Sequence, residues 1–226
     1  MPVALTFTSL QTTMQAYLER GTGLTDPTVF GQFPLLINNA ERAIARRLKI
    51  LGMNIPLVST LTANTAVYTK PNGWRRTISM NYGVATTPGG PQNSATPLFA
   101  RQYEYCLGQW PDLTKLANST PGTPVAYYAD YDYAHWLIVP TPDINYPWQV
   151  LYYGLPQLLD SSNQTNFWTN YAPETLLYRT MLECAPFLKN DERVQMWTTL
   201  YEEAVTTLEK EDLMRSVDRA AVRNED

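Results

Sequence analysis

The sequence predicts an α+β fold: a small α-helical bundle formed by the N- and C-terminal helices, with a β-rich domain inserted between them. Apolar side chains recur at helical spacing near both ends of the chain. The middle, residues 54–170, holds 18 of the 27 aromatic residues and 12 of the 17 prolines, but only 11 charged residues. Aromatic and β-branched residues favour strands and prolines mark turns, so this part is expected to be β-rich with long loops.

The composition excludes most kinds of catalytic site. The chain has two cysteines, Cys106 and Cys184, far apart in sequence, and one histidine, His135. A zinc site needs several Cys or His ligands, and a Ser-His-Asp or Cys-His arrangement has only His135 to use. No phosphate loop or nucleophile-elbow motif is present. We therefore expect no enzymatic activity, catalytic residue, cofactor or metal, and a hydrogen-bonded structural role for His135.

The net charge and the hydropathy of the chain restrict the classes of binding partner that we expect. The net charge is −4 and the pI is near 5.1, whereas general nucleic-acid binding needs a basic surface. The excess negative charge lies in residues 171–226, which hold seven basic and twelve acidic side chains. No run of about 18 apolar residues occurs, so no membrane span is expected.

The N-terminal segment, residues 1–53, is expected to contribute two helices to the bundle. The first is capped by Thr8 or Ser9 and ended by Gly21. The second runs from about Phe33 to Leu51, with Pro34 in its first turn. Its apolar stripe consists of Phe33, Leu36, Ile37, Ala40, Ile44, Leu48 and Leu51.

A basic strip lies opposite that stripe. Arg42, Arg46 and Lys49 are stacked by the four- and three-residue spacing of a helix. One interpretation is a solvated polar face. The alternative is a strip that faces a partner or the DNA channel, or that makes the chain a DNA-binding module.

The insert, residues 54–170, is expected to contain six strands and one short helix. A turn is predicted at residues 71–73, an exposed loop at 83–97 and a helix at 98–109. Residues 123–154 read as a β-meander. The strands are expected near 56–62, 65–70, 75–82, 123–131, 135–140 and 147–154.

Seven aromatic side chains crowd this insert: Tyr127, Tyr128, Tyr131, Tyr133, Trp136, Tyr152 and Tyr153. One interpretation is packing across the strands of a small sheet. The alternative is a carbohydrate-binding or carbohydrate-cleaving protein that uses these rings. In that alternative, Asp130 and Asp132 share a strand face and act as a glycosidase-like carboxylate pair.

The stretch CAPFLKNDERVQMW, residues 184–197, is predicted to join two helices. The first begins near Pro173 and stops by Lys189, because Pro186 lacks an amide hydrogen. Asn190 or Asp191 then caps a second helix. Residues 171–212 therefore form an antiparallel helical hairpin of the bundle.

Residues 213–226 form a C-terminal tail. Arg215, Arg219 and Arg223 are spaced by four and share one face if the tail is helical. The tail is too short to be a stable helix alone. It is either a disordered, solvated tail or a segment that orders on a partner.

The two ends of the chain resemble the head–tail adaptor proteins of tailed bacteriophages. The motif YAPETLLYRTMLECAPFLK begins the matching C-terminal part, which continues through Trp197 and Tyr201 to Leu208. NNAERAIARRL, residues 38–48, is similar to a helix that these proteins carry near their start. The order of helices, β-rich insert and helices also agrees.

The resemblance implies a structural role at the head–tail junction of the virion. Such adaptors form a ring, typically of twelve copies, beneath the portal protein, extend the DNA channel and dock the tail or nozzle protein. DNA passes through the ring without sequence-specific binding. Because the C-terminal segment of related adaptors reaches along the portal, the resemblance assigns portal contact here to Leu213, Arg215, Arg219 and Arg223.

Overall fold

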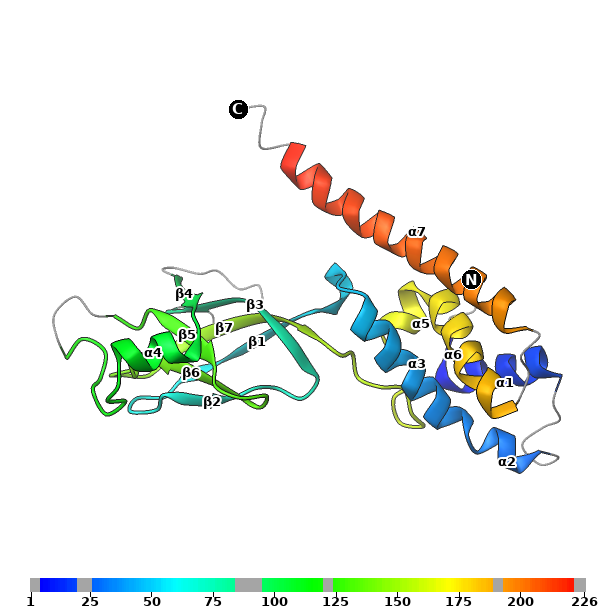
Figure 1. The fold of residues 1–226 in the computed structure, drawn as a ribbon, viewed down its shortest axis with the longest axis horizontal. Coiled ribbons are helices and arrows are strands. Elements are labelled where there is room, and N and C mark those ends of the chain that lie inside the picture. The colour runs from blue at the N-terminus through cyan, green and yellow to red at the C-terminus, as the bar shows by residue number, and fades with distance from the viewer. Residues whose placement is uncertain (1–4, 20–25, 84–94, 120–123, 189–192, 222–226) are drawn as a thin grey trace. The chain divides into compact units, whose positions relative to one another are not determined.

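The computed structural model describes residues 5–19, 26–83, 95–119, 124–188 and 193–221. Contacts divide the chain into a helical unit, Met1–Met53 with Leu155–Asp226, and a sheet unit, Asn54–Gly154 (Figure 1). The predicted α+β class is confirmed, because helices from the two ends pack together and the middle forms a seven-stranded sheet. The expected insert extended to residue 170, whereas the chain rejoins the helical unit at Leu155.

In its described residues, the helical unit contains seven α-helices or short helical turns. Helix α3 packs against α6, and α6 packs against α7. The bounds are α1 Phe7–Leu18, α2 Pro27–Phe30, α3 Phe33–Arg47, the 3-10 turn η1 Leu51–Met53, α5 Phe167–Tyr171, α6 Pro173–Leu188 and α7 Val194–Ala221.

Helix α1 begins one turn earlier than its predicted caps. Thr6 is the N-cap: its hydroxyl accepts from the Ser9 backbone N–H at 3.0 Å, and the Ser9 hydroxyl accepts from the Thr6 N–H at 2.7 Å. Two orphan donors are thereby satisfied, and Ser9 sits three residues inside the helix. The prediction of Thr8 or Ser9 as the cap is therefore wrong. The helix ends at Leu18, and the predicted stop, Gly21, lies outside the described residues.

The predicted stripe is buried except for Leu51, which is 37% exposed, and helix α3 ends four residues early. Phe33, Ile37 and Ile44 are almost fully buried. The backbone turns extended at Leu48, so the expected continuation to Leu51 is wrong. A separate η1 turn follows, whose Gly52 packs so closely on Phe167 that a Cβ there would lie 2.0 Å from the ring.

A buried carboxyl group ties α3 to the returning chain. Glu41 has no exposed surface. Its Oε2 accepts from the Leu159 N–H at 3.0 Å, and its Oε1 accepts from the Asn166 side-chain amide. Burial raises the pKa of Glu41 to about 7, although these hydrogen bonds and the charge of Arg42 lower it. Glu41 therefore fixes the segment that leads from the sheet unit into α5.

The predicted helical hairpin is confirmed as α6 and α7. Helix α6 begins at Pro173 and ends at Leu188, two residues after Pro186. The predicted caps Asn190 and Asp191 lie outside the described residues. Helix α7 runs to Ala221, so part of the expected tail continues the helix.

The sheet unit is a seven-stranded sheet in the order β1-β7-β3-β4-β5-β6-β2. All described pairings are antiparallel except that of β4 with β5. The bounds are β1 Asn54–Leu61, β2 Val67–Thr69, β3 Trp74–Tyr82, β4 Thr96–Ala100, α4 Tyr103–Gln109, β5 Tyr127–Asp130, β6 His135–Val139 and β7 Tyr146–Gly154.

Two sequence-based expectations for this sheet are wrong. Strand β4 was missed, because residues 98–100 extend the sheet and the predicted helix begins only at Tyr103. The β-meander is also wrong: β5 pairs with β6, but β7 lies between β1 and β3. Pro140 and Pro142 follow β6 and have no N–H to donate, so the chain leaves the ladder there.

The predicted turn at residues 71–73 is confirmed by the left-handed Gly73 (φ 78°). Most of the predicted loop, residues 84–94, lies outside the described residues.

The sheet unit has one main core and a smaller one on the opposite side of β5 and β6. The main core contains Trp136, Trp148 and Met80, all at most 2% exposed. The smaller core places Cys106 of α4 against Leu137 and Val139 of β6. Helix α4 therefore covers the second face of this hairpin.

Trp197→Ala is expected to lower the free energy of unfolding of the helical unit by about 3–5 kcal/mol, because Trp197 is 4% exposed and stacks edge-on to Tyr17 at 5.5 Å. Denaturant unfolding followed by circular dichroism measures the change. The control is Met196→Ala, whose side chain is 47% exposed and whose loss is expected to cost less than about 0.5 kcal/mol. Equal stabilities for the two variants would contradict this packing.

Glu41 is expected to make the stability of the helical unit fall as pH rises between about 4.5 and about 7. The pKa of Glu41 is raised in the folded state, so its stabilising contribution is complete below pH 4.5 and is lost as pH rises through about 7. The loss over this window is about 3 kcal/mol. Glu41→Gln removes the titration, so the stability advantage of wild type over this variant should shrink by that amount across the window. A constant difference from pH 4.5 to 8 would contradict the assignment.

Candidate assembly surfaces

The two aspartates of the carbohydrate alternative do not form a pair. Asp130 ends β5, and its Oδ1 lies 2.8 Å from the Lys70 ammonium. Asp132 lies in the turn after β5, where its Oδ1 accepts from the backbone N–H groups of Ala134 and His135, at 2.6 Å each. One carboxylate caps a turn and the other balances a lysine, which favours structural roles for both over a glycosidase-like pair.

His135 has the hydrogen-bonded structural role that the sequence predicts. Its Nδ1 lies 2.8 Å from Oδ2 of Asp132, three residues earlier. The hydrogen bond from His135 holds the pKa of Asp132 below its usual range. The pair closes the turn between β5 and β6.

Lys70 is enclosed by the same turn. Its side chain is 2% exposed, its Nζ donates to the Asp132 carbonyl at 2.7 Å, and it lies 3.8 Å from the centre of the Trp74 ring. A buried ammonium needs such compensation from a carboxylate, a carbonyl and a ring face. This cluster therefore stabilises the sheet unit.

The aromatic side chains of the insert mostly pack within it. Tyr128, Trp136 and Tyr152 are buried in the main core, whereas Tyr131 and Tyr133 are exposed at the β5–β6 turn. Trp74 contacts both Trp136 and Tyr133 edge-on, at 6.3 and 6.4 Å between ring centres. Rings divided between a core and a turn make cross-strand packing the better interpretation.

The described residues contain no group of three or more His, Cys, Asp or Glu side chains that could hold a metal ion. Both cysteines are buried and unpaired, and burial raises the pKa of Cys184 to about 12. Within the same residues, no helix is long and apolar enough to cross a membrane.

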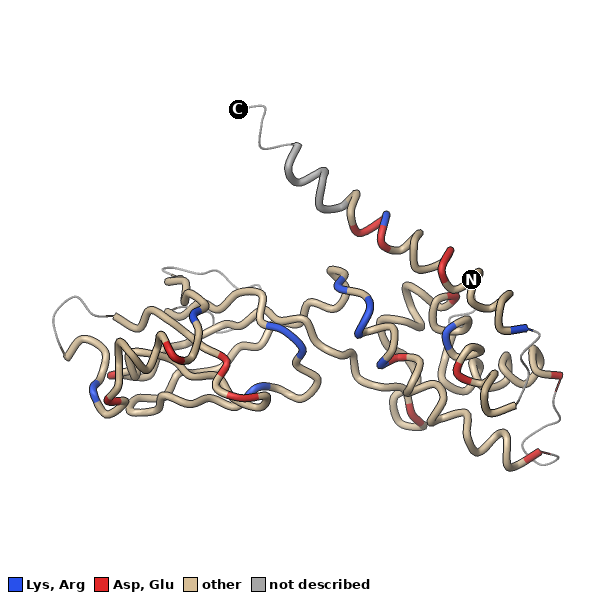
Figure 2. Tube along the Cα trace, in the orientation of Figure 1, with Lys and Arg blue, Asp and Glu red and all other residues tan. Residues whose placement is uncertain are grey.

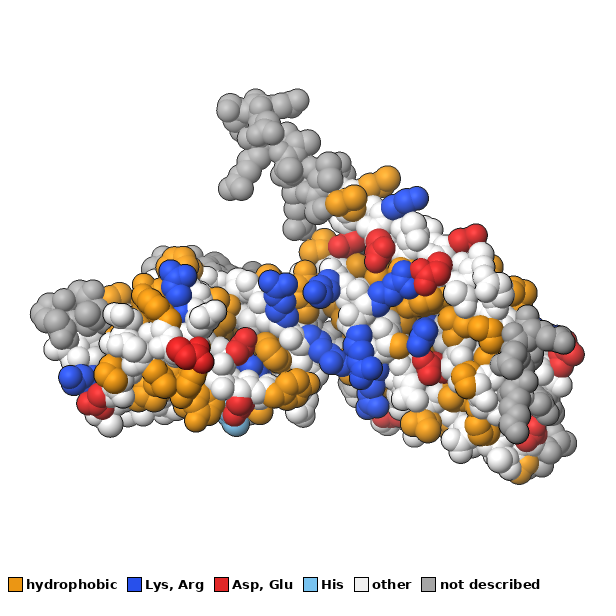
Figure 3. Space-filling view, viewed as in Figure 1, with side chains coloured by type: hydrophobic (Ala, Val, Ile, Leu, Met, Phe, Trp, Pro, Cys, Tyr) orange, Lys and Arg blue, Asp and Glu red, His pale blue; other side chains and the backbone are white. Residues whose placement is uncertain are grey.

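The predicted basic strip is partly preserved. Arg42 and Arg46 are exposed on α3, but Lys49 follows the end of that helix, so the three do not share one helix face. Figure 2 shows basic residues along the C-terminal half of α3, and Figure 3 shows their side chains on the surface. We call Arg42 and Arg46 the α3 arginine pair.

Arg47, next to this pair, instead contacts α7 and anchors it. Its two terminal nitrogens each lie 2.6 Å from a carboxylate oxygen of Glu202, and its guanidinium lies 5.4 Å from the centre of the Tyr201 ring. The hydrogen bond to Arg47 lowers the pKa of Glu202. Both side chains are more than a third exposed, so this ion pair orients α7 more than it stabilises it.

The second half of α7 leaves the packed part of the helical unit. Trp197, Tyr201 and Val205 are buried, but no side chain from 206 to 214 is. Asp212, further along α7, still attaches the helix to the η1 turn, because its Oδ1 accepts a hydrogen bond from the Leu51 N–H at 3.0 Å. In Figure 1 the end of α7 extends beyond the other helices of its unit.

Three of the four residues assigned to portal contact lie on this part of α7, and the fourth lies outside the described residues. Leu213 is 62% exposed, and its neighbour Met214 is 66% exposed. The helical backbone includes Arg215 and Arg219, whose side chains are outside the described ones. Arg223 lies outside the described residues.

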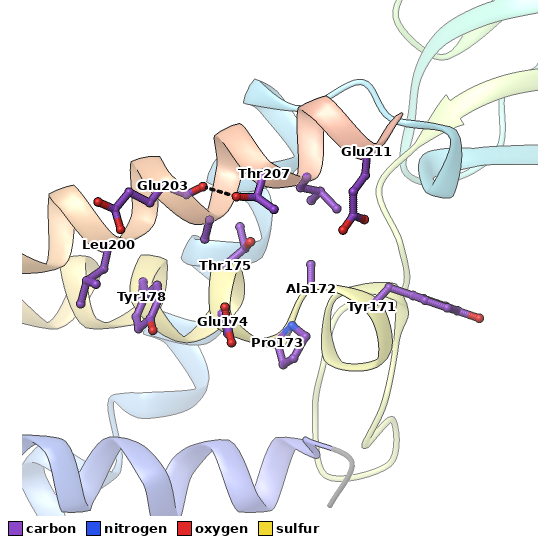
Figure 4. Close-up of a pocket in the computed structure, with 12 residues that line it drawn as sticks. Tyr171, Ala172, Pro173, Glu174, Thr175, Tyr178, Leu200, Glu203, Thr207 and Glu211 are labelled. Atoms are coloured by element: carbon purple, nitrogen blue, oxygen red, sulfur yellow. Dashed lines mark hydrogen bonds between the residues drawn. The ribbon is translucent and has the colours of Figure 1, made fainter. Parts of the chain in front are cut away.

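A groove of about 450 Å³ lies between the start of α6 and the middle of α7 (Figure 4). We call it the α6–α7 groove. Its apolar lining includes Ala172, Pro173, Leu200, Ala204 and Leu208. Its three charged side chains, Glu174, Glu203 and Glu211, are all acidic. Figure 4 shows Glu211 directed from α7 toward the start of α6 and Tyr171 directed away.

Sequence reasoning missed Glu41, Arg47 and the groove. Glu41 falls four residues after Ile37 and three before Ile44, inside the apolar stripe, which is a readable signal of a buried carboxyl. Arg47 has no such signal, because its partner Glu202 is 155 residues away. The groove depends on the packing angle of α6 and α7, which the apolar spacing does not determine.

A family model described as SU10 adaptor protein matches residues 5–224, nearly the whole chain. None of the curated proteins matches the chain.

Proposed function

Because the chain belongs to the SU10 adaptor protein family, a family of phage head–tail adaptors, we propose that it joins the portal to the tail at the head–tail junction of a virion. Twelve copies form a ring under the portal protein, extend the DNA channel and dock the tail or nozzle protein. The role is structural and needs no catalysis. The family match over residues 5–224 carries this proposal.

The distal part of α7 is the segment that reaches the portal. It projects from the helical unit, and Leu213 and Met214 expose most of their apolar surface to solvent. Exposed apolar side chains together with arginines are typical of protein interfaces. Leu213, Arg215, Arg219 and Arg223 are therefore the proposed portal contacts, with the arginines as ion-pairing groups.

The charge of the chain suits a DNA conduit. The net charge of −4 disfavours tight binding to phosphates, so DNA passes through the ring without sequence-specific contacts. The α3 arginine pair lies on a chain that is acidic elsewhere, and two arginines alone support little duplex binding at physiological salt.

The first test compares the mass of the full chain, alone and mixed with the portal protein of the same virus. The expected result is a monomer that becomes a closed ring on the portal, measured by native mass spectrometry or sedimentation. A chain that folds but does not associate with the portal would overturn the proposal.

Removal of residues 213–226 is expected to weaken portal binding at least about tenfold and to leave the melting temperature unchanged, because no described side chain after Val205 is buried. The matched control is Phe187→Ser, which removes a 43% exposed apolar side chain at the end of α6 and is expected to bind normally. Normal portal binding by the truncated chain would exclude α7 as the contact.

A further inference from the structure

The α6–α7 groove has the composition of a site for a basic protein surface. Its lining combines apolar side chains with Glu174, Glu203 and Glu211 and includes no Lys or Arg. Within the described part of the chain, none of these three carboxylates forms an ion pair. A groove of mixed polar and apolar lining whose charged side chains are all of one sign favours a partner of the opposite sign.

The three carboxylates of the groove lie on two different helices, two on α7 and one on α6. Glu203 and Glu211 lie eight residues apart on α7, which corresponds to about 12 Å along the helix. Thr207 lies between them, and its hydroxyl donates back to the Glu203 carbonyl at 2.9 Å. Glu174 lies opposite, in the first turn of α6. The groove thus offers acceptors on two sides.

The α3 arginine pair carries the charge opposite to that of the α6–α7 groove. Arg42 and Arg46 are exposed and lie four residues apart on α3, about 6 Å along the helix axis. Neither forms an ion pair with a described side chain, in contrast to Arg47, which is held by Glu202. Guanidinium groups form strong charge-assisted hydrogen bonds with carboxylates, so the arginine pair is complementary in charge to the groove.

The two surfaces belong to one chain and share no residue. The groove is formed by α5, α6 and α7, whereas the arginine pair lies on α3. One copy can therefore use both surfaces at once, each toward a different neighbour. Contacts between unlike surfaces lead from copy to copy in one direction and close into a ring when the rotation fits.

We propose that neighbouring copies of this chain dock the α3 arginine pair of one copy into the α6–α7 groove of the next. The inference rests on the proposed ring and assigns its subunit contact. Arg42 and Arg46 form ion pairs with Glu203, Glu211 and Glu174 of the neighbour, beside the apolar side chains of the groove. The contact weakens as salt concentration rises.

The test uses two charge-reversed variants of the full chain. Variant A carries Arg42→Glu and Arg46→Glu, and variant B carries Glu203→Lys and Glu211→Lys. In A alone, acidic side chains meet an acidic groove, and in B alone, basic side chains meet a basic groove. Each variant alone is expected to assemble on the portal at least about tenfold less than wild type. An equal mixture is expected to restore the ring, because every A–B contact is then complementary.

Native mass spectrometry identifies the mixed ring by a mass that corresponds to equal numbers of A and B. The matched control, Arg76→Glu with Lys115→Glu, changes the net charge as much as A does but on the sheet unit, and it is expected to assemble normally. Circular dichroism checks that each variant is folded. Should a reversed variant fail to fold, neutral variants replace it. One carries Arg42→Gln with Arg46→Gln, and the other carries Glu203→Gln with Glu211→Gln. Each is expected to assemble less than wild type and with a weaker dependence on salt concentration.

The outcomes distinguish the subunit contact from the portal role. Rings formed by A or B alone, or no ring from their mixture while wild type forms one, would overturn this contact and leave the portal role intact. Salt-sensitive self-association that A and B lose and their mixture restores, without any binding to portal, would support the contact and overturn the portal role. A wild-type chain that neither self-associates nor binds portal would overturn both.

Discussion

The helical unit depends on the burial of α6 between α3 and α7. The apolar side of α6, including Leu176, Met181 and Cys184, is almost fully buried, and α6 contacts both neighbours. Because α3 precedes the sheet unit in sequence and α6 follows it, this contact joins segments that are separated by the whole insert. The entropy of closing such a loop grows only slowly with its length, so a long insert is compatible with a stable bundle. The sheet unit has its own core and can therefore vary in its loops without loss of the bundle.

The same packing explains why α7 can serve a partner. The side of α7 that meets α6 and α3 is buried only as far as Val205, and two polar ties, Arg47 with Glu202 and Asp212 with the Leu51 N–H, fix its direction. The remaining turns of α7 contribute nothing to the described core. A helix whose first half is anchored and whose second half is exposed presents a preorganised surface, which lowers the entropy cost of binding.

Helical periodicity predicted most of the bundle, and local propensity predicted less of the sheet. The stripe on α3 and the hairpin joined near Pro186 were readable because burial repeats every three to four residues. The order of strands was not readable, because pairing of β7 with β1 and β3 is a long-range choice that short segments do not encode. The sequence predicted the arginine pair as part of a polar helix face. It did not predict the groove of opposite charge, because Glu174 and Glu211 come together only through helix packing. The family resemblance supplied the role at the head–tail junction.

The central claim is that the exposed half of α7, rather than the sheet unit, makes the contact with the portal. A cryo-electron microscopy map of the portal–adaptor complex tests it most directly, because it locates α7 and the sheet unit with respect to the portal in every copy. The account predicts density for α7 beyond Val205 against the portal surface in each subunit. A map in which the sheet unit alone touches the portal and the end of α7 contacts nothing would contradict it.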